Sequence, residues 1–87
     1  MKRIEAMRAC LATLKPVSLE IVDESHKHAG HAGARDGGGH YLLQIVTTEF
    51  TGKTTMARHR MIYSALGEMM KREIHALNIQ ANTPEEI

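Results

Sequence analysis

Cysteine and aromatic residues are scarce in this chain of 87 residues. It contains one cysteine, Cys10, together with no tryptophan, two tyrosines and one phenylalanine. A single cysteine excludes a disulfide framework within the chain and any metal site built only from cysteines. Six methionines supply part of the missing apolar bulk, and methionine packs equally well into cores and adaptable binding surfaces. The length predicts one domain spanning residues 1–87 with a thin core.

Long apolar runs are also missing. No stretch reaches the roughly 20 apolar residues that a membrane-spanning helix requires. Residues 1–14 are amphipathic and lack the apolar core of a signal peptide. We therefore expect a cytosolic protein that does not enter a membrane.

Sequence signatures of common enzyme classes are absent as well. The chain contains no G-x-S-x-G motif and no phosphate-binding P-loop. Asp23 and Glu24 are adjacent at the end of a predicted strand, so their side chains point apart and do not form a catalytic pair. Cys10 has no neighbour in sequence that would activate it as a nucleophile. These absences predict a protein that is not an enzyme.

Positive charge gathers in one segment, although the net charge is only +1. Residues 51–72 contain five basic residues and one acidic residue. Lys53, Arg58 and Arg60 are the candidates there for contact with an anionic partner such as DNA. A solvated helix face explains the same pattern, and it is the interpretation that the sequence favours.

Hydrophobic periodicity divides the first half of the chain into one helix and two strands. Apolar residues at helical spacing predict a helix over 4–14 that ends before Pro16. Alternating apolar residues predict strands over 17–22 and 41–47. Between them, residues 23–39 lose all periodicity and contain five glycines. This segment is predicted to be a mobile loop.

The second half predicts one long helix and one more strand. Thr54 or Thr55 can cap a helix that runs to about Arg72. Its apolar stripe comprises Met56, His59, Ile62, Tyr63, Leu66, Met69 and Met70. Alternation resumes over 75–81, and a right-handed crossover places this strand parallel to the second one. The sequence Thr83-Pro84-Glu85-Glu86 is typical of a helix start.

Together these elements predict an α+β fold in the order αββαβ. Two helices are expected to pack on one face of a three-stranded mixed sheet. The first two strands are expected to be antiparallel, and the last two parallel.

Histidine supplies the chemistry that cysteine does not. The predicted loop contains His26, His28 and His31, in the spacing H-x-H-x-x-H, and His40 follows at its exit. Imidazole binds zinc, copper, iron and nickel, and a flexible loop can bring two rings onto one ion. A solvated polar loop explains the same residues, so both interpretations stay open.

Two further histidines lie outside the loop. His59 falls inside the predicted apolar stripe, which indicates a buried histidine that anchors the helix by a hydrogen bond; a phosphate contact is the alternative. His75 opens the last strand, on the side of Leu77. Because the two parallel strands begin at the same end of the sheet, we expect His75 to lie near the loop, where His28 or His31 could meet it.

Four sequence elements in this order resemble the BolA-like family, in its histidine-loop subgroup. They are Asp23-Glu24-Ser25 followed by His28 and His31, then Phe50-Thr51-Gly52, then Arg58-His59-Arg60-Met61-Ile62-Tyr63, and finally Ile74-His75-Ala76-Leu77. None of the elements is specific alone, whereas their combination at these separations is. The resemblance covers nearly the whole chain and implies a fold akin to the class II KH arrangement.

The resemblance also implies a cofactor and a partner. The partner would be a monothiol glutaredoxin of the C-G-F-S type, joined to this chain through a shared 2Fe-2S cluster. His75 corresponds to the C-terminal ligand of the family, and His28, with His31 as the alternative, corresponds to the loop ligand. The glutaredoxin and its bound glutathione would supply the sulfur, so no cofactor is expected in the isolated chain. Some bacterial members are linked to transcription, which implies DNA contact as the second possibility.

Overall fold

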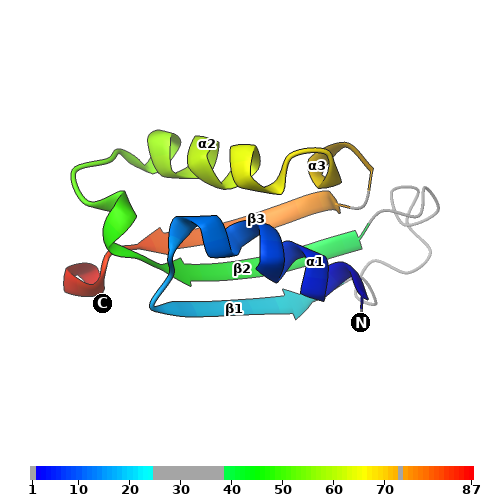
Figure 1. Cartoon of the computed structure of the whole chain (residues 1–87), viewed down its shortest axis with the longest axis horizontal. Coiled ribbons are helices and arrows are strands. Elements are labelled where there is room, and N and C mark those ends of the chain that lie inside the picture. The colour runs from blue at the N-terminus through cyan, green and yellow to red at the C-terminus, as the bar shows by residue number, and fades with distance from the viewer. Residues whose placement is uncertain (1, 25–38, 73) are drawn as a thin grey trace.

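The computed structural model of the chain describes residues 2–24, 39–72 and 74–87. These residues form one β-sheet with helices packed against it (Figure 1). The three strands lie in the order β1-β2-β3, so the second strand of the sequence is the central one. The predicted order of helices and strands is confirmed.

The sheet is mixed. Its strands are β1 (Ser18–Asp23), β2 (Gly39–Val46) and β3 (Ile74–Asn82). β1 pairs with β2 in antiparallel orientation, and β3 pairs with β2 in parallel orientation. Because β1 ends where β2 and β3 begin, three segment ends meet at one end of the sheet.

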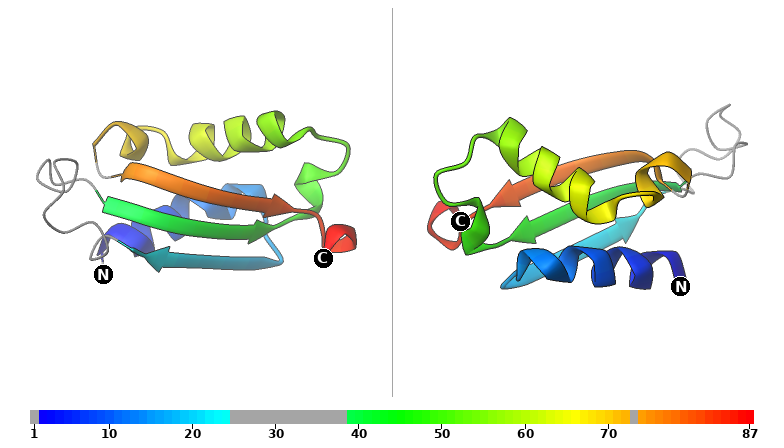
Figure 2. Two further views of the ribbon diagram at one scale, coloured as in Figure 1. Left: turned by 180° about the vertical axis from the view of Figure 1, so that it is seen from behind. Right: turned by 45° about the horizontal axis from the view of Figure 1, so that its top comes forward.

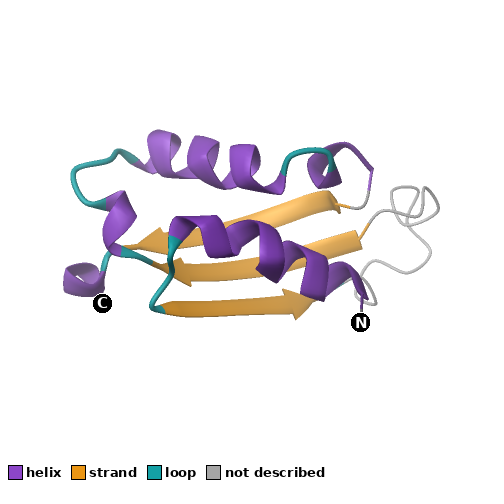
Figure 3. Cartoon of the chain, viewed as in Figure 1, coloured by secondary structure: helices purple, strands orange, loops and turns teal. Residues whose placement is uncertain are grey.

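Helices cover one face of this sheet, and no described helix lies on the other face (Figures 1 and 2). The α-helices are α1 (Lys2–Leu11), α2 (Thr55–Leu66) and α3 (Met69–Arg72). Short 3-10 helices complete the fold (Figure 3): η1 (Ala12–Leu14), η4 (Thr48–Phe50) and η5 (Pro84–Glu86). None of the helices in the described part of the chain is long and apolar enough to cross a membrane.

The core lies between the sheet and the helices. Its buried side chains come from all three strands and from α1, η4 and α2: Met7, Leu11, Ile21, Tyr41, Leu43, Ile45, Phe50, Ile62, Leu66 and Ile74. Gly39 is required at the start of β2, because a Cβ atom there would overlap the ring of Tyr41. Thr47 is fully buried, and its hydroxyl donates a 2.7 Å hydrogen bond to the carbonyl of Leu14.

The predicted ends of the helices are confirmed in part. Lys15, before Pro16, adopts a left-handed conformation (φ 53°), which stops the first helix where the sequence predicts. Thr54 caps α2 by accepting a 3.1 Å hydrogen bond from the N–H of Ala57. The single helix predicted to reach Arg72 is broken in two, because Gly67 takes a positive φ of 57° and ends α2.

The predicted apolar stripe of α2 is displaced around the helix. Arg58, Ile62 and Leu66 are its buried residues, whereas Met56 is 65% exposed and Tyr63 is 42% exposed. Residues four apart lie on the same side of an α-helix, so the buried side follows the positions of these three residues. Ile62 and Leu66 belong to the predicted stripe, whereas Arg58 is buried although its charge excludes it from a stripe defined by hydrophobicity.

Candidate functional site

His75 lies at an irregularity where β3 begins. The register pairs Gly39 with Ile74 and His40 with Ala76, so β3 carries one extra residue at His75. Ile74 is only 3% exposed and occupies the position toward the core, and His75 is exposed. The alternation that places Leu77 against the core therefore does not extend back to His75, contrary to the sequence prediction.

The extra residue brings His75 next to His40. The centroids of the two imidazole rings are 5.1 Å apart, and the ring planes are inclined by 49°. His40 is half-buried at the start of the central strand, beside the exposed ring of His75. No role for His40 is predicted from the sequence. The two rings lie side by side because the bulge adds His75 to β3 next to His40.

The anchors of the predicted loop lie at the same end of the sheet. The N–H of Glu24 donates a 2.7 Å hydrogen bond to the carbonyl of His40, which fixes the end of β1 beside the start of β2. Glu24 and Gly39, the two residues that flank the predicted loop, thus lie at the same end of the sheet as His75, as the topology predicts. The loop candidates His26, His28 and His31 lie outside the described residues.

Few metal donors gather at this end of the sheet among the described residues. Within residues 2–24, 39–72 and 74–87, no group of three or more His, Cys, Asp or Glu residues could hold a metal ion. Cys10 is half-buried in α1 and packs against the core. This end of the sheet therefore offers imidazole nitrogen at an exposed position, whereas thiolate sulfur would have to come from elsewhere. Imidazole is a ligand that 2Fe-2S centres accept, so the exposed ring of His75 is compatible with such a group.

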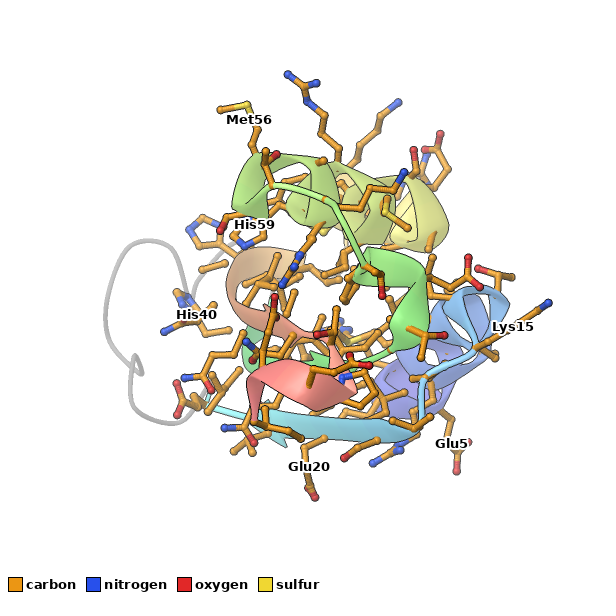
Figure 4. The ribbon with its side chains drawn as sticks, turned by 90° about the vertical axis from the view of Figure 1, so that its left-hand side faces the viewer. Glu5, Lys15, Glu20, His40, Met56 and His59 are labelled. Carbon is orange, nitrogen blue, oxygen red and sulfur yellow. The ribbon has the colours of Figure 1, made fainter. Side chains whose placement is uncertain are left out.

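A groove of about 580 Å³ adjoins this site. It is lined by Glu24, His40, Tyr41, His59 and strand residues 76–79. His59 is half-buried and makes an edge contact with Tyr63, with ring centroids 6.3 Å apart. The predicted buried anchor is thus wrong for His59, which lines a groove between α2 and β3 (Figure 4).

Arg58, not His59, is the buried polar residue that holds α2 in place. Its guanidinium donates to both carboxylate oxygens of Glu86, at 2.6 and 2.8 Å, and to the carbonyls of Ala81 and Lys53, each at 3.0 Å. It also lies over the Phe50 ring, 5.8 Å from the ring centroid. We call these residues the Arg58 cluster. The contacts join the start of α2, the end of β3 and η5.

Electrostatics in the Arg58 cluster favour the charged forms of both partners. The hydrogen bond from Arg58 and the backbone N–H of Thr83 lower the pKa of Glu86 to about 2. The hydrogen bond to Glu86 likewise raises the pKa of Arg58. The spacing of Arg58 to Ile62 and Leu66 is the sequence signal that could have revealed its burial.

The candidate DNA contacts are therefore not equivalent. Arg58 is 9% exposed and its donors are engaged within the fold, so it is withdrawn as a phosphate contact. Lys53 and Arg60 are exposed. Of the three candidate contacts, these two side chains are the ones that can still reach a second molecule.

Comparison with known proteins decides the family. Residues 11–86 match the family model described as BolA-like protein. The chain belongs to the BolA-like family. The resemblance to this family is thus confirmed, while the assignment to the histidine-loop subgroup stays a prediction. The BolA-like fold accounts for the mixed three-stranded sheet.

Relatives of this BolA-like chain differ widely in length. SufE-like protein 1, chloroplastic/mitochondrial, of Arabidopsis thaliana is 47% identical over 79 residues, which cover 85% of this chain and 21% of that protein. The DNA-binding transcriptional regulator BolA of Escherichia coli (strain K12) is 41% identical over 75 residues, covering 86% of this chain and 69% of the regulator. The solved BolA domain of SufE1 from Arabidopsis thaliana has a TM-score of 0.87 at 42% identity and covers 100% of this chain and 98% of that domain. This BolA-like chain thus spans about a fifth of the plant SufE-like protein and the whole of its BolA domain.

Proposed function

We propose that this chain is a non-enzymatic iron–sulfur adaptor that shares a 2Fe-2S cluster with a monothiol glutaredoxin. The observation that carries the proposal is His75, an exposed imidazole at a bulge beside both anchors of the histidine-containing loop. Membership of the BolA-like family supports the same proposal. Cluster trafficking and iron or redox sensing are the roles that such an adaptor would serve.

The residues of this chain would supply nitrogen ligands. His75 would donate one imidazole nitrogen, and the loop would donate a second through His28 or His31. The packed ring of His40 limits the rotation of the His75 ring. When bound, the shared cluster would supply electron transfer and transferable iron and sulfide. Neutral imidazole in place of thiolate removes negative charge, which raises the reduction potential of such a centre.

Reconstitution with a partner tests the proposal. The chain is mixed with a monothiol glutaredoxin, glutathione, iron and sulfide, and the complex is followed by size, visible circular dichroism and electron paramagnetic resonance. We expect a heterodimer whose spectra carry the signature of histidine ligation. His75→Ala should change that signature, because it removes one of the two proposed nitrogen ligands. His59→Ala is the control, because His59 lies on α2 and is not a proposed ligand.

Two outcomes would refute parts of the proposal separately. Unchanged spectra in His75→Ala would refute the ligand assignment, whereas the absence of a heterodimer in the unsubstituted chain would refute the adaptor role. His28→Ala and His31→Ala, tested singly, identify the loop ligand as the one whose loss changes the spectra.

DNA binding is the second candidate function. It is favoured by the name of the Escherichia coli relative, a DNA-binding transcriptional regulator. Lys53 and Arg60 would be the phosphate contacts, since both are exposed on the basic segment. Lys53 precedes α2 and Arg60 lies in the middle of that helix, whereas His75 lies at the start of β3.

A further inference from the structure

Two histidine rings meet where β2 and β3 begin. His40 lies on the central strand and His75 on the strand beside it, with ring centroids 5.1 Å apart. The ring planes are inclined by 49°, so the rings do not stack face to face. The two residues come from distant parts of the sequence, and the pairing of the strands brings their imidazoles together.

The backbone fixes the positions of both residues. His40 pairs with Ala76 on one side, and on the other side its carbonyl accepts a 2.7 Å hydrogen bond from the N–H of Glu24. His75 is the extra residue of the bulge and follows Ile74, whose side chain is buried in the core. A bulge re-aims a side chain, and residues on strands hold a binding geometry better than residues in loops do. The pair is thus prearranged by the sheet.

The separation of the rings suits a shared metal ion. A zinc ion bound at about 2.0–2.1 Å to a ring nitrogen lies about 3.2 Å from the centroid of that ring. Two rings that bind one ion at a tetrahedral angle therefore have centroids about 5.2 Å apart. The rings of His40 and His75, at 5.1 Å, have the spacing of such a chelating pair.

The surroundings of the pair favour a cation. The adjoining groove is lined by His40 and by Glu24, which is the one carboxylate among its described lining residues. Within the described part of the chain, no lysine or arginine lines this groove. Neutral imidazole is the form that binds metals, and a carboxylate nearby adds to the attraction of a positive ion.

We infer that His40 and His75 form a binding site for one divalent ion of zinc, copper or nickel. Imidazole suits these ions, whereas magnesium and calcium prefer oxygen ligands. The described residues supply no third protein ligand, so water would complete the coordination. A metal-bound histidine donates the N–H of its other ring nitrogen, so each ring can keep a hydrogen bond while it binds the ion. The site needs neither the loop histidines nor sulfur from a partner, so it does not depend on the proposed cluster.

Zinc titration of the chain alone tests the inference. A triple variant with His26→Ala, His28→Ala and His31→Ala excludes any metal that the predicted loop binds. We expect this variant to bind one zinc ion per chain in isothermal titration calorimetry. The imidazole NMR signals of His40 and His75 should shift together, and magnesium should shift neither. Absence of zinc binding in the triple variant would overturn the inference.

Single substitutions in the triple variant locate the ion. His40→Ala and His75→Ala should each weaken zinc binding at least about tenfold, since even the loss of an outer partner of a metal ligand has such an effect. His59→Ala is the control, because His59 lies on α2 and lines the groove without belonging to the pair. Unchanged binding in His75→Ala, a substitution of an exposed side chain, would overturn the inference. An equal loss in His59→Ala would do so too.

Copper reports on the ligands themselves. In the triple variant, the electron paramagnetic resonance spectrum of bound Cu²⁺ should show splitting from two nitrogens, and in the triple variant with His75→Ala from one. A copper spectrum without nitrogen splitting would leave the two rings as a packing contact and overturn the inference. No glutaredoxin is present in these measurements, so their failure would not affect the proposed adaptor role, and failure to form a heterodimer would not affect this site.

Discussion

Arg58 illustrates how one partly apolar, fully charged side chain can anchor several distant segments. The guanidinium has five donors in a fixed plane, and its partners here are a carboxylate and two carbonyls. The bidentate geometry with Glu86 is the arrangement in which arginine binds a carboxylate most strongly. A lysine at the same position could not make these contacts together.

Stability at low pH should depend on Glu86. Its pKa is about 2 in the folded chain, against an ordinary value of 4.5. A lowered pKa stabilises the folded state fully above the ordinary value, and this contribution is lost as the pH falls from about 5 toward 2. Glu86→Gln should lower Tm by several degrees at pH 7 and flatten the decline of Tm below pH 5. Circular dichroism melts from pH 7 to pH 2 measure both effects.

Glu85 provides the control for this experiment because it is the exposed neighbour in η5. Glu85→Gln should leave both Tm at neutral pH and its acid decline close to those of the unsubstituted chain. Equal acid declines for the unsubstituted chain and Glu86→Gln would contradict a stabilising role for the Arg58 cluster.

At the scale of single elements, the bulge at the start of β3 lets two consecutive residues have different roles: Ile74 packs in the core and His75 is a candidate ligand. Ile74 is 3% exposed and belongs to the core, whereas His75 next to it is exposed. Ile74→Ala should therefore cost about 2–5 kcal/mol of unfolding free energy, as for other buried isoleucines. His75→Ala should change stability by less than about 0.5 kcal/mol.

Urea denaturation of the two single variants measures this difference. A large loss of stability in His75→Ala would show that the ring supports the fold, which would weaken its use as a free ligand. A small loss in Ile74→Ala would contradict the register that places Ile74 in the core.

Sequence patterns predicted the elements well and their local irregularities poorly. Apolar residues at alternate positions of the predicted strand 41–47 agree with the burial of Tyr41, Leu43 and Ile45 in the core. The bulge was missed, since one extra residue leaves the composition of β3 unchanged. The side of α2 was missed because burial of Arg58 depends on Glu86, which lies far away in the sequence.

The whole molecule carries three candidate surfaces: the start of β3 with His75, the groove that adjoins it, and the basic segment. Topology predicted that the start of β3 lies beside the loop anchors, since β1 ends where β2 and β3 begin. The groove beside β3 could not be predicted, because it requires both the register of the strand and the position of α2. The basic segment is a third surface, and with Arg58 engaged internally, Lys53 and Arg60 are the candidate contacts that stay exposed on it.

If DNA binds the basic segment, the binding should be weak and sensitive to salt. Two phosphate contacts predict a fall in affinity of about tenfold between 50 and 200 mM salt. Lys53→Ala and Arg60→Ala should each reduce the slope of log affinity against log salt by about 1. Fluorescence anisotropy with a labelled duplex measures the slope. Lys15 is exposed and lies outside the basic segment, so Lys15→Ala provides the control. A slope that neither substitution changes would exclude this surface.

The central position of β2 has a consequence for the speed of folding. β2 must find two partners, pairing Tyr41 with Asp23 on one side and with Leu77 on the other. The second pair is separated by twice as many residues as the first, 36 against 18, which adds only about 0.6 kcal/mol of loop-closure cost. Neither pairing is local, so the transition state has to assemble contacts between distant parts of the chain. This small domain should therefore fold more slowly than a helical bundle of equal length.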